Sequence, residues 1–220
     1  MPNNIGEAHL TLGLIMEIDV TQIPTYIISL KTANERRSKM TNLMSSLGIE
    51  SWTFFDAIDV TNKFPYWIGC GLSHRELLAT AEYPCIIYED DILPTNWYKK
   101  ILTLPTDGIC YLGISRWGIK EGFSNVNGVE FIKTSVPETL QVKHMVSAHA
   151  VYYPNKETAS IFANGITKQL FENLKPMDEW FAKMQTEMNV YCLRQPIFYQ
   201  NCDKNNIWTN FEVNENDIVL

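Results

Sequence analysis

Short apolar runs alternate along the chain with polar segments in which apolar residues recur every three or four positions. Residues 25–30 and 85–88 are continuous apolar runs rich in β-branched and aromatic side chains, which is typical of buried strands. Similar runs predict further strands at residues 52–58, 109–113, 148–153 and 190–200. Strands that alternate with helices predict an α/β fold with a mainly parallel central sheet flanked by helices, with some antiparallel pairing after residue 148.

Capping signals predict where the helices begin and end. Thr32 and Glu35 have the spacing of a capping box before an apolar stripe, and Gly48 supplies a stop signal. Ser73 and Glu76 repeat the capping-box spacing, so Ser73 is expected to be the N-cap of a second helix. Further helices are predicted at residues 96–102, from Asn155 to Gly165 and from Pro176 onward.

The length of 220 residues indicates a single domain over residues 1–220. Residues 1–22 are expected to form an N-terminal arm or an extra strand. Their apolar run is too short to cross a bilayer and its flanks are acidic, so no transmembrane segment or signal peptide is expected there. Residues 114–147 carry little periodicity, and a loop of that length is more often functional than idle.

Composition and charge exclude several functional classes. Eighteen Lys and Arg against 25 Asp and Glu give a net charge of −7, and no basic cluster offsets it, so nucleic acid is not an expected partner. Apolar residues make up 45% of the chain, as in ordinary globular proteins. Five scattered cysteines without a CxxC motif predict reduced thiols and a cytoplasmic location rather than a disulfide framework or a zinc site.

An acidic triplet, Glu89, Asp90 and Asp91, follows the apolar run at residues 85–88. Open α/β sheets bind their ligands at the carboxyl ends of strands, and carboxylates are common ligands of Mn²⁺ and Mg²⁺. Residues two apart in an extended segment project to the same side, so Glu89 and Asp91 are candidate metal ligands. By itself the triplet fits a nuclease, a phosphotransferase or a nucleotide-sugar enzyme, and a solvated acidic turn is the structural alternative.

Five motifs follow one another at characteristic spacing: Leu30-Lys31, Glu35-Arg36-Arg37, Phe55-Asp56-Ala57, the Gly69-Cys70-x-x-Ser73-His74 block, and Glu89-Asp90-Asp91. In this order the chain resembles family 25 glycosyltransferases, which include lipopolysaccharide β-galactosyltransferases and collagen galactosyltransferases. The resemblance covers residues 24–115 well, and residues 148–162 and 176–181 more weakly.

The resemblance implies a GT-A type nucleotide-sugar-binding fold and an inverting transfer that depends on Mn²⁺ or Mg²⁺. The implied donor is a UDP-sugar, with galactose as the expected sugar. The implied acceptor is a hydroxyl of a glycan, a lipid-linked glycan or a protein. Residues 114–147 would then form an acceptor-side loop, in which Trp117 is a candidate for stacking on a sugar.

Site residues follow from the same resemblance. Ser29, Leu30 and Lys31 end the first strand, where nucleotide contacts are expected through the backbone. Arg36 is preferred to Arg37 as the partner of the diphosphate, because neighbouring helical residues point in different directions. Asp90 is expected to meet the ribose.

An inverting transfer needs one general base to accept the proton of the acceptor hydroxyl. Asp178 is the preferred candidate and Glu179 the second, since both lie at the start of a predicted helix. A carboxylate there also complements the helix dipole, which is the structural alternative. Of the histidines, His74 is interpreted as an ordinary helix residue, and His149 as a less favoured candidate for approaching the metal.

Two other functions remain open at this point. A metal-dependent phosphoester hydrolase would use the same acidic triplet, but it usually needs further ligands for a second ion. A non-catalytic domain that binds a nucleotide sugar or glycan is the other alternative, against which the intact acidic triplet argues.

Overall fold

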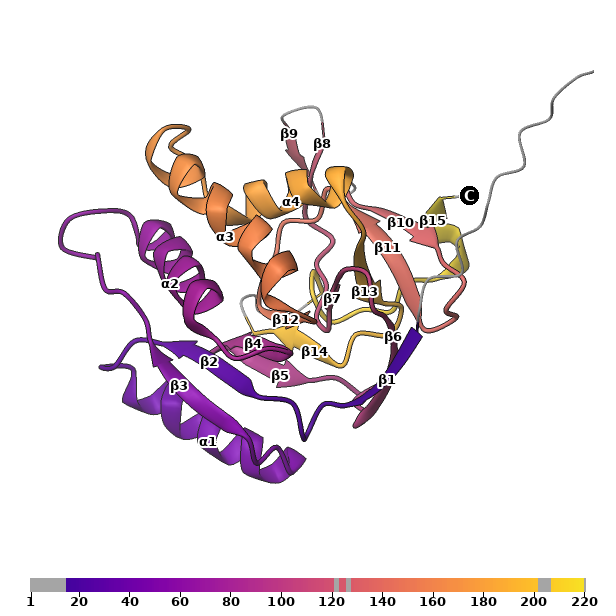
Figure 1. Ribbon diagram of the computed structural model, residues 1–220, viewed down its shortest axis with the longest axis horizontal. Coiled ribbons are helices and arrows are strands. Elements are labelled where there is room, and N and C mark those ends of the chain that lie inside the picture. Colours follow the sequence, from indigo (N-terminus) through magenta and orange to yellow (C-terminus); the bar gives the residue numbers. More distant parts are fainter. Residues whose placement is uncertain (1–14, 121–122, 126–127, 202–206, 220) are drawn as a thin grey trace, which may run out of the picture.

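The computed structural model describes residues 15–120, 123–125, 128–201 and 207–219 (Figure 1). Its helices are α1 (Asn34–Leu47), α2 (Tyr66–Thr80), α3 (Lys156–Phe171), α4 (Met177–Glu187) and a 3₁₀ turn at Glu215–Asp217. Its strands are β1 (Ile15–Asp19), β2 (Thr25–Ser29), β3 (Trp52–Asp56), β4 (Cys85–Glu89), β5 (Ile92–Pro94), β6 (Ile101–Pro105), β7 (Ile109–Tyr111), β8 (Gly118–Lys120), β9 (Phe123–Asn125), β10 (Glu130–Lys133), β11 (Thr139–Lys143), β12 (Ala150–Tyr153), β13 (Val190–Leu193), β14 (Phe198–Gln200) and β15 (Ile218–Val219).

The central sheet is mixed, so the α/β class is confirmed while the expectation of a mainly parallel sheet is wrong. Among the described strands, nine form one sheet in the order β15-β10-β11-β13-β7-β12-β4-β2-β3. Four of its neighbouring pairs are parallel and four are antiparallel. Three smaller two-stranded sheets, β1-β6, β14-β5 and β8-β9, are antiparallel.

The distribution of helices explains this mixture. Parallel neighbours need a crossover connection, usually a helix, whereas antiparallel neighbours need only a short turn. Helices α1 and α2 connect β2, β3 and β4, which are accordingly parallel. No helix is found among the described residues between β4 and β12, and β12 returns antiparallel to β4.

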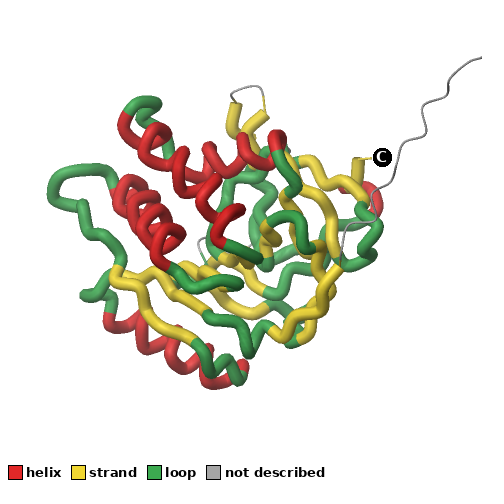
Figure 2. Tube along the Cα trace, in the orientation of Figure 1, coloured by secondary structure: helices red, strands yellow, loops and turns green. Residues whose placement is uncertain are grey.

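Helices cover both faces of the sheet (Figures 1 and 2). Helix α1 lies on one face, and α2, α3 and α4 lie on the other. The alternation along β4 matches these layers, because successive side chains of a strand point to opposite faces. Cys85 and Ile87 join the core under α2–α4, whereas Ile86 and Tyr88 join the core under α1.

The helix that follows β2 is confirmed, although its expected start signal is not used. Gly48 caps α1 with a φ of +71°, a left-handed conformation that glycine adopts without strain. The predicted capping box is wrong, because α1 begins after Ala33 and Glu35 pairs instead with Lys39 at 2.7 Å. A helix start at Asn155 is confirmed, with its side chain accepting a bond from the Thr158 N–H at 2.9 Å.

Ser73 does not cap a helix, since α2 already begins at Tyr66. Ser73 is fully buried in the second turn, where its hydroxyl donates to the Gly69 carbonyl at 2.6 Å and accepts from the Ile58 N–H at 2.8 Å. The apolar run that precedes Ser73 is therefore part of the helix. Ser73 fixes α2 to the loop after β3 rather than opening the helix.

Three further local predictions are wrong. Residues 96–102 are not helical; they lead into β6, and Trp97 lies half-buried in the preceding turn. Gly165 does not end α3, which continues to Phe171. The glycine instead makes room for Trp180, since a Cβ at this position would clash with the indole ring. The range 114–147 is not an irregular loop, since it contains β8, β9, β10 and β11.

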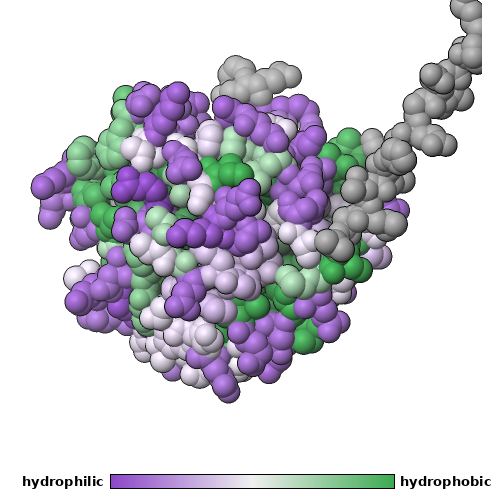
Figure 3. Space-filling model, viewed as in Figure 1, coloured by the Kyte–Doolittle hydropathy of each residue, from purple (hydrophilic) through white to green (hydrophobic). Residues whose placement is uncertain are grey.

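Within the part of the chain that the structure describes, no helix has the length and apolar character that a membrane span requires. Hydrophobic and hydrophilic residues are interspersed on the face shown in Figure 3. At the amino-terminal end, β1 pairs with β6, so the described part of the range 1–22 contributes a strand. Residues 1–14 lie outside the described residues.

Candidate active site

The carboxyl ends of β2, β3 and β4 meet at one edge of the sheet. Ser29 at the end of β2 lies in register with Asp56 at the end of β3, and Ile28 with Glu89 at the end of β4. A cleft of about 530 Å³ opens at this edge. Its walls come from the ends of β2 and β4, the loop after β3, the start of α2 and Gln200. This is the position at which open α/β sheets bind ligands.

Asp90 holds the first wall of the cleft together. Its two carboxylate oxygens accept bonds from the Arg36 guanidinium at 2.7 Å and from the Ser29 hydroxyl at 2.6 Å. The Arg36 side chain is 58% exposed, whereas that of Asp90 is 11% exposed. Asp90 therefore holds the Arg36 guanidinium at the mouth of the cleft. Both carboxylate oxygens of Asp90 are engaged in these two bonds.

Arg37, the arginine that the sequence disfavoured, has a structural role. Its guanidinium donates to the carbonyls of Ser29 at 2.8 Å and Leu30 at 3.1 Å, and to Asp56 at 2.5 Å. These bonds tie α1 to the ends of β2 and β3. Lys31 does not line the cleft; its side chain is 82% exposed and lies 4.0 Å from Asp56.

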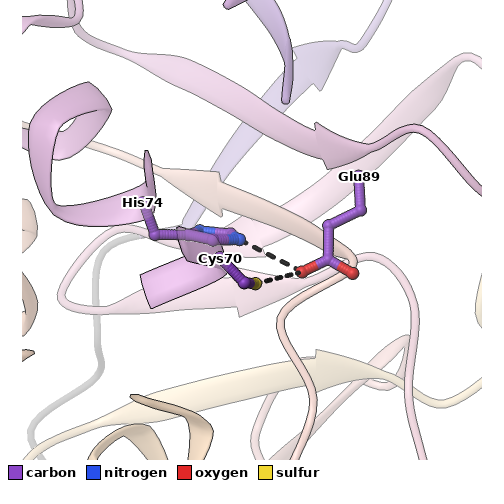
Figure 4. A group of neighbouring side chains, drawn as sticks. All are labelled: Cys70, His74 and Glu89. Atoms are coloured by element: carbon purple, nitrogen blue, oxygen red, sulfur yellow. Dashed lines mark hydrogen bonds and ion pairs between the residues drawn. The ribbon is translucent and has the colours of Figure 1, made fainter. Parts of the chain in front are cut away.

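The Glu89 side chain points toward Cys70 and His74 of helix α2 (Figure 4), and Glu89 also lines the cleft. One of its oxygens, Oε1, lies 3.1 Å from His74 Nε2 and 3.7 Å from Cys70 Sγ, which come from neighbouring turns of α2. Burial would raise the pKa of Glu89, but the hydrogen bond and charge of His74 hold it below its usual value. Burial and the charge of Glu89 raise the pKa of the Cys70 thiol. Glu89 is thus kept as a carboxylate.

The other oxygen of Glu89 faces Asp91. The Gln200 amide nitrogen donates to Glu89 Oε2 at 3.1 Å and to Asp91 Oδ2 at 3.3 Å, so it bridges the two carboxylates. Asp91 Oδ1 is buried and has no partner among the described residues. Burial, together with the charge of Glu89, raises the pKa of Asp91 to about 7. An amide N–H therefore occupies the position in which a cation would relieve the repulsion.

Asp178 and Glu179 begin α4, and they face different surroundings. Burial, followed by the charges of Glu89 and Glu179, raises the pKa of Asp178 to about 6. Asp178 therefore lies within electrostatic range of Glu89, although it does not line the cleft. Glu179 forms an ion pair with Lys175 at 2.8 Å.

Two other candidates lie outside the cleft lining. His149 is fully buried, its Nδ1 lies 2.6 Å from the Ser147 hydroxyl, and burial lowers its pKa to about 4. Trp117 is 38% exposed and stacks against Trp208 with ring centroids 5.6 Å apart. His149 nevertheless lies beside Glu89: the Glu89 N–H donates to the His149 carbonyl at 2.9 Å, and the two side chains interact electrostatically. Trp117 does not line the cleft.

Sequence reasoning missed Cys70, His74 and Gln200 as neighbours of the acidic triplet. The spacing of Cys70 and His74, four residues apart on a helix, could have shown that both face one side. Gln200 had no comparable signal, because it is 111 residues from Glu89 and arrives on a strand that pairs with β5.

The comparisons with known proteins bear on the segment that builds the first wall of the cleft. No curated protein matches the chain. Residues 22–64 match the family model described as Glycosyltransferase family 25 (LPS biosynthesis protein). The matched segment contains β2, α1 and β3, and with them Ser29, Leu30 and Arg36.

This match confirms the resemblance over its first three motifs. It ends before the Gly69-Cys70 block, the acidic triplet and α4, so the roles of those residues are argued from geometry. Residues 22–64 are thus similar to family 25 glycosyltransferases, and this family 25 segment supports glycosyltransferase activity.

Proposed function

We propose that this protein is a metal-dependent inverting glycosyltransferase that moves a hexose, galactose foremost, from a UDP-sugar to a hydroxyl of a glycan acceptor. The observation that carries the proposal is the cleft in which the family 25 segment meets the acidic end of β4. The wall formed by β2 and α1 offers an oriented arginine, and the adjacent end of β4 offers two neighbouring carboxylates. A nucleotide diphosphate needs both kinds of group.

The GT-A type arrangement belongs to this proposal. Strands β3, β2 and β4 are parallel and are connected through α1 and α2, which supports a nucleotide-binding half at this edge. Free thiols at Cys70, Cys85, Cys110 and Cys192 support a reducing, cytoplasmic setting. The LPS biosynthesis description of the family supports a glycan or lipid-linked glycan as acceptor.

Donor binding is assigned to the wall formed by β2 and α1. Arg36 is exposed at the mouth of the cleft and is held by Asp90, so its planar guanidinium can contact the diphosphate oxygens. Ser29 and Leu30 line the same wall and are assigned to the nucleoside through their backbone. Since both oxygens of Asp90 are engaged, we assign it the orientation of Arg36 in place of a direct contact with the ribose.

The residues at the end of β4 fit a hard divalent cation. Glu89 Oε2 and Asp91 Oδ2 already share one donor, and Asp91 Oδ1 is a buried oxygen without a partner among the described residues. Oxygen ligands of this kind suit Mn²⁺ or Mg²⁺. When bound there, such an ion would stabilise the negative charge that develops on the departing diphosphate.

Asp178 is assigned as the general base. In an inverting transfer, the acceptor oxygen forms the bond to the anomeric carbon while the bond to the diphosphate oxygen breaks, and the hydroxyl proton passes to the base. A carboxyl with a pKa of about 6 is ionised at neutral pH and is a stronger base than an ordinary aspartate. Glu179 is less suited to this role because Lys175 engages it.

The donor and the metal can be tested together by thermal unfolding. UDP-sugars, GDP-sugars and free UDP are each added with Mn²⁺ and with a chelator. A ligand present at 100 times its dissociation constant stabilises the folded state by about 2.7 kcal/mol, which a melting curve detects. We expect stabilisation by a UDP-sugar only with Mn²⁺, and no response to any nucleotide would contradict the proposal.

The variant Asp91→Asn separates catalysis from folding. We expect it to lose Mn²⁺-dependent UDP binding and sugar transfer while its melting temperature in chelator changes little. Asp19→Asn is the matched control, because the Asp19 carboxylate accepts bonds from Thr21 and Asp19 lies outside the cleft lining. Sugar transfer that survives in Asp91→Asn, or is lost equally in Asp19→Asn, would overturn the metal assignment.

A further inference from the structure

Cys70, His74 and Glu89 form a compact cluster of three different donor atoms at the inner wall of the cleft (Figure 4). Cys70 and His74 are four residues apart on α2 and face the same side, and Glu89 reaches them from the end of β4. The sulfur, nitrogen and oxygen atoms all lie within 4.8 Å of one another. His74 is fully buried, whereas Cys70 and Glu89 line the cleft.

Two of the three spacings in this cluster match edges of a tetrahedral zinc site. With Zn–S near 2.3 Å and Zn–N and Zn–O near 2.1 Å, a tetrahedron has an N–O edge of about 3.4 Å and an S–O edge of about 3.6 Å. The corresponding distances here are 3.1 Å between His74 Nε2 and Glu89 Oε1, and 3.7 Å between Cys70 Sγ and the same oxygen. Only small side-chain movements are needed to place three ligands around one ion.

The hydrogen bonding of His74 does not oppose this use. Its Nδ1 is buried and has no partner among the described residues, and its Nε2 donates to Glu89. To bind an ion, Nε2 gives up its proton, to Nδ1 from the neutral ring or to solvent from the charged ring, and neither route breaks a hydrogen bond at Nδ1. The bond from Nε2 to Glu89 is exchanged for a bond to the ion.

We propose that Cys70, His74 and Glu89 bind a thiophilic divalent ion, Zn²⁺ foremost, with the fourth coordination position open to the cleft. On binding, the Cys70 thiol releases its proton to solvent and the thiolate coordinates the ion. Thiolate and imidazole ligands select Zn²⁺ over Mg²⁺ and Mn²⁺, so this donor set differs from the oxygens of Asp91. The site does not depend on sugar transfer.

Glu89 belongs to both donor sets, which gives the thiophilic site a consequence for catalysis. An ion bound to Cys70 and His74 engages the carboxylate that the proposed Mn²⁺ site also needs. Zn²⁺ is therefore expected to inhibit sugar transfer in competition with Mn²⁺. This consequence rests on the proposed function, whereas binding of the thiophilic ion is measured without any sugar donor.

Cobalt titration of the full-length, metal-free protein tests the binding directly. Co²⁺ takes zinc sites and reports a thiolate ligand by a charge-transfer absorption band in the near ultraviolet. We expect this band to appear with one equivalent of Co²⁺ and to disappear when Zn²⁺ is added. We expect Cys70→Ser to lose the band and to bind Co²⁺ at least tenfold more weakly.

Two controls locate the ion. Cys202→Ser removes a cysteine outside the described residues, and Asp91→Asn removes a carboxylate that the cluster does not use; both are expected to keep the band. His74→Gln, a second test should Cys70→Ser fold poorly, is expected to weaken Co²⁺ binding at least tenfold. Absence of the band in the unmodified protein, its persistence in Cys70→Ser, or its loss in Asp91→Asn would refute the site.

Discussion

The amide of Gln200 bridges the carboxylates of Glu89 and Asp91, which would otherwise repel each other. Hydrogen bonds to charged groups contribute about 1.5–3 kcal/mol each, and here they also offset a charge repulsion. Gln200→Ala is therefore expected to lower the free energy of unfolding by about 1–3 kcal/mol in chelator. The same variant should gain more stability from Mn²⁺ than the unmodified protein does, as measured by thermal unfolding at matched metal concentrations.

Gln195 provides the matched control for this experiment. Its amide also donates to a carboxylate, Glu212 at 2.9 Å, but the pair is exposed. Exposed polar pairs contribute little, so Gln195→Ala should change the free energy of unfolding by less than about 0.5 kcal/mol. An equal response of both variants to Mn²⁺ would show that Gln200 does not mark a cation position.

The pH dependence of transfer distinguishes the two carboxylates at the start of α4. The base form of Asp178 predominates above its pKa of about 6, so kcat/KM should fall roughly tenfold per pH unit below pH 6. Glu179→Gln removes a charge that raises this pKa, and the acid limb should therefore move to lower pH with transfer retained. Asp178→Asn should lose about 10²–10⁴-fold in kcat.

The pH profile is measured with saturating metal ion, so that the raised pKa of Asp91 does not contribute its own limb. Loss of transfer in Glu179→Gln with full activity in Asp178→Asn would assign the base to Glu179. If the acid limb of the kcat/KM profile does not shift in Glu179→Gln, then Asp178 does not control that limb.

At the scale of elements, Arg36 and Arg37 divide binding and stability between neighbouring positions of α1. Arg37→Ala removes bonds to two backbone carbonyls and to Asp56, and it is expected to lower the free energy of unfolding by about 1–3 kcal/mol. Arg36→Ala removes a half-exposed ion pair, for which we expect a loss of less than about 1 kcal/mol together with weaker UDP-sugar binding. Denaturant unfolding and nucleotide-dependent melting measure the two effects separately.

The reverse result, in which Arg37→Ala folds normally but loses the donor, would exchange the two roles. The sequence favoured Arg36 for the diphosphate, and that preference stays a prediction until these variants are compared. The sequence could not assign a role to Arg37, because its partners are backbone carbonyls at the end of β2 and a residue of β3. Such contacts become visible only when the strands are placed side by side.

Local signals predicted the elements whose ends are set by local chemistry. Gly48 ends α1 and Asn155 begins α3 through bonds to nearby backbone, which a short stretch of sequence encodes. The predictions for Ser73 and Gly165 were wrong because contacts with distant segments determine the environment of each residue. Ser73 bonds to Ile58 of another segment, and Gly165 makes room for Trp180 of another helix.

At the scale of the whole molecule, the predictable part of the site is the part built from parallel strands. The acidic triplet and the motif after β2 each follow a predicted strand. Because β2, β3 and β4 are parallel, their carboxyl ends lie at the same edge of the sheet. The contribution of Gln200 depends on β14 pairing antiparallel with β5, and no periodicity in residues 190–200 encodes that partner. The expectation of a mainly parallel sheet failed for the same reason.

This division of the molecule predicts where a donor changes backbone dynamics. The loops after β2 and β3, residues 30–33 and 57–61, border the cleft and contribute Leu30, Ala33 and residues 57–61 to its lining, whereas β10 and β11 lie on the far side of β13 in the sheet. If a UDP-sugar with Mn²⁺ occupies the cleft at 100 times its dissociation constant, openings that require its release become about 100-fold rarer. Hydrogen exchange should therefore slow in residues 30–33 and 57–61 and remain unchanged in β10 and β11. Slowing that is uniform along the chain, or confined to β10 and β11, would place the donor elsewhere.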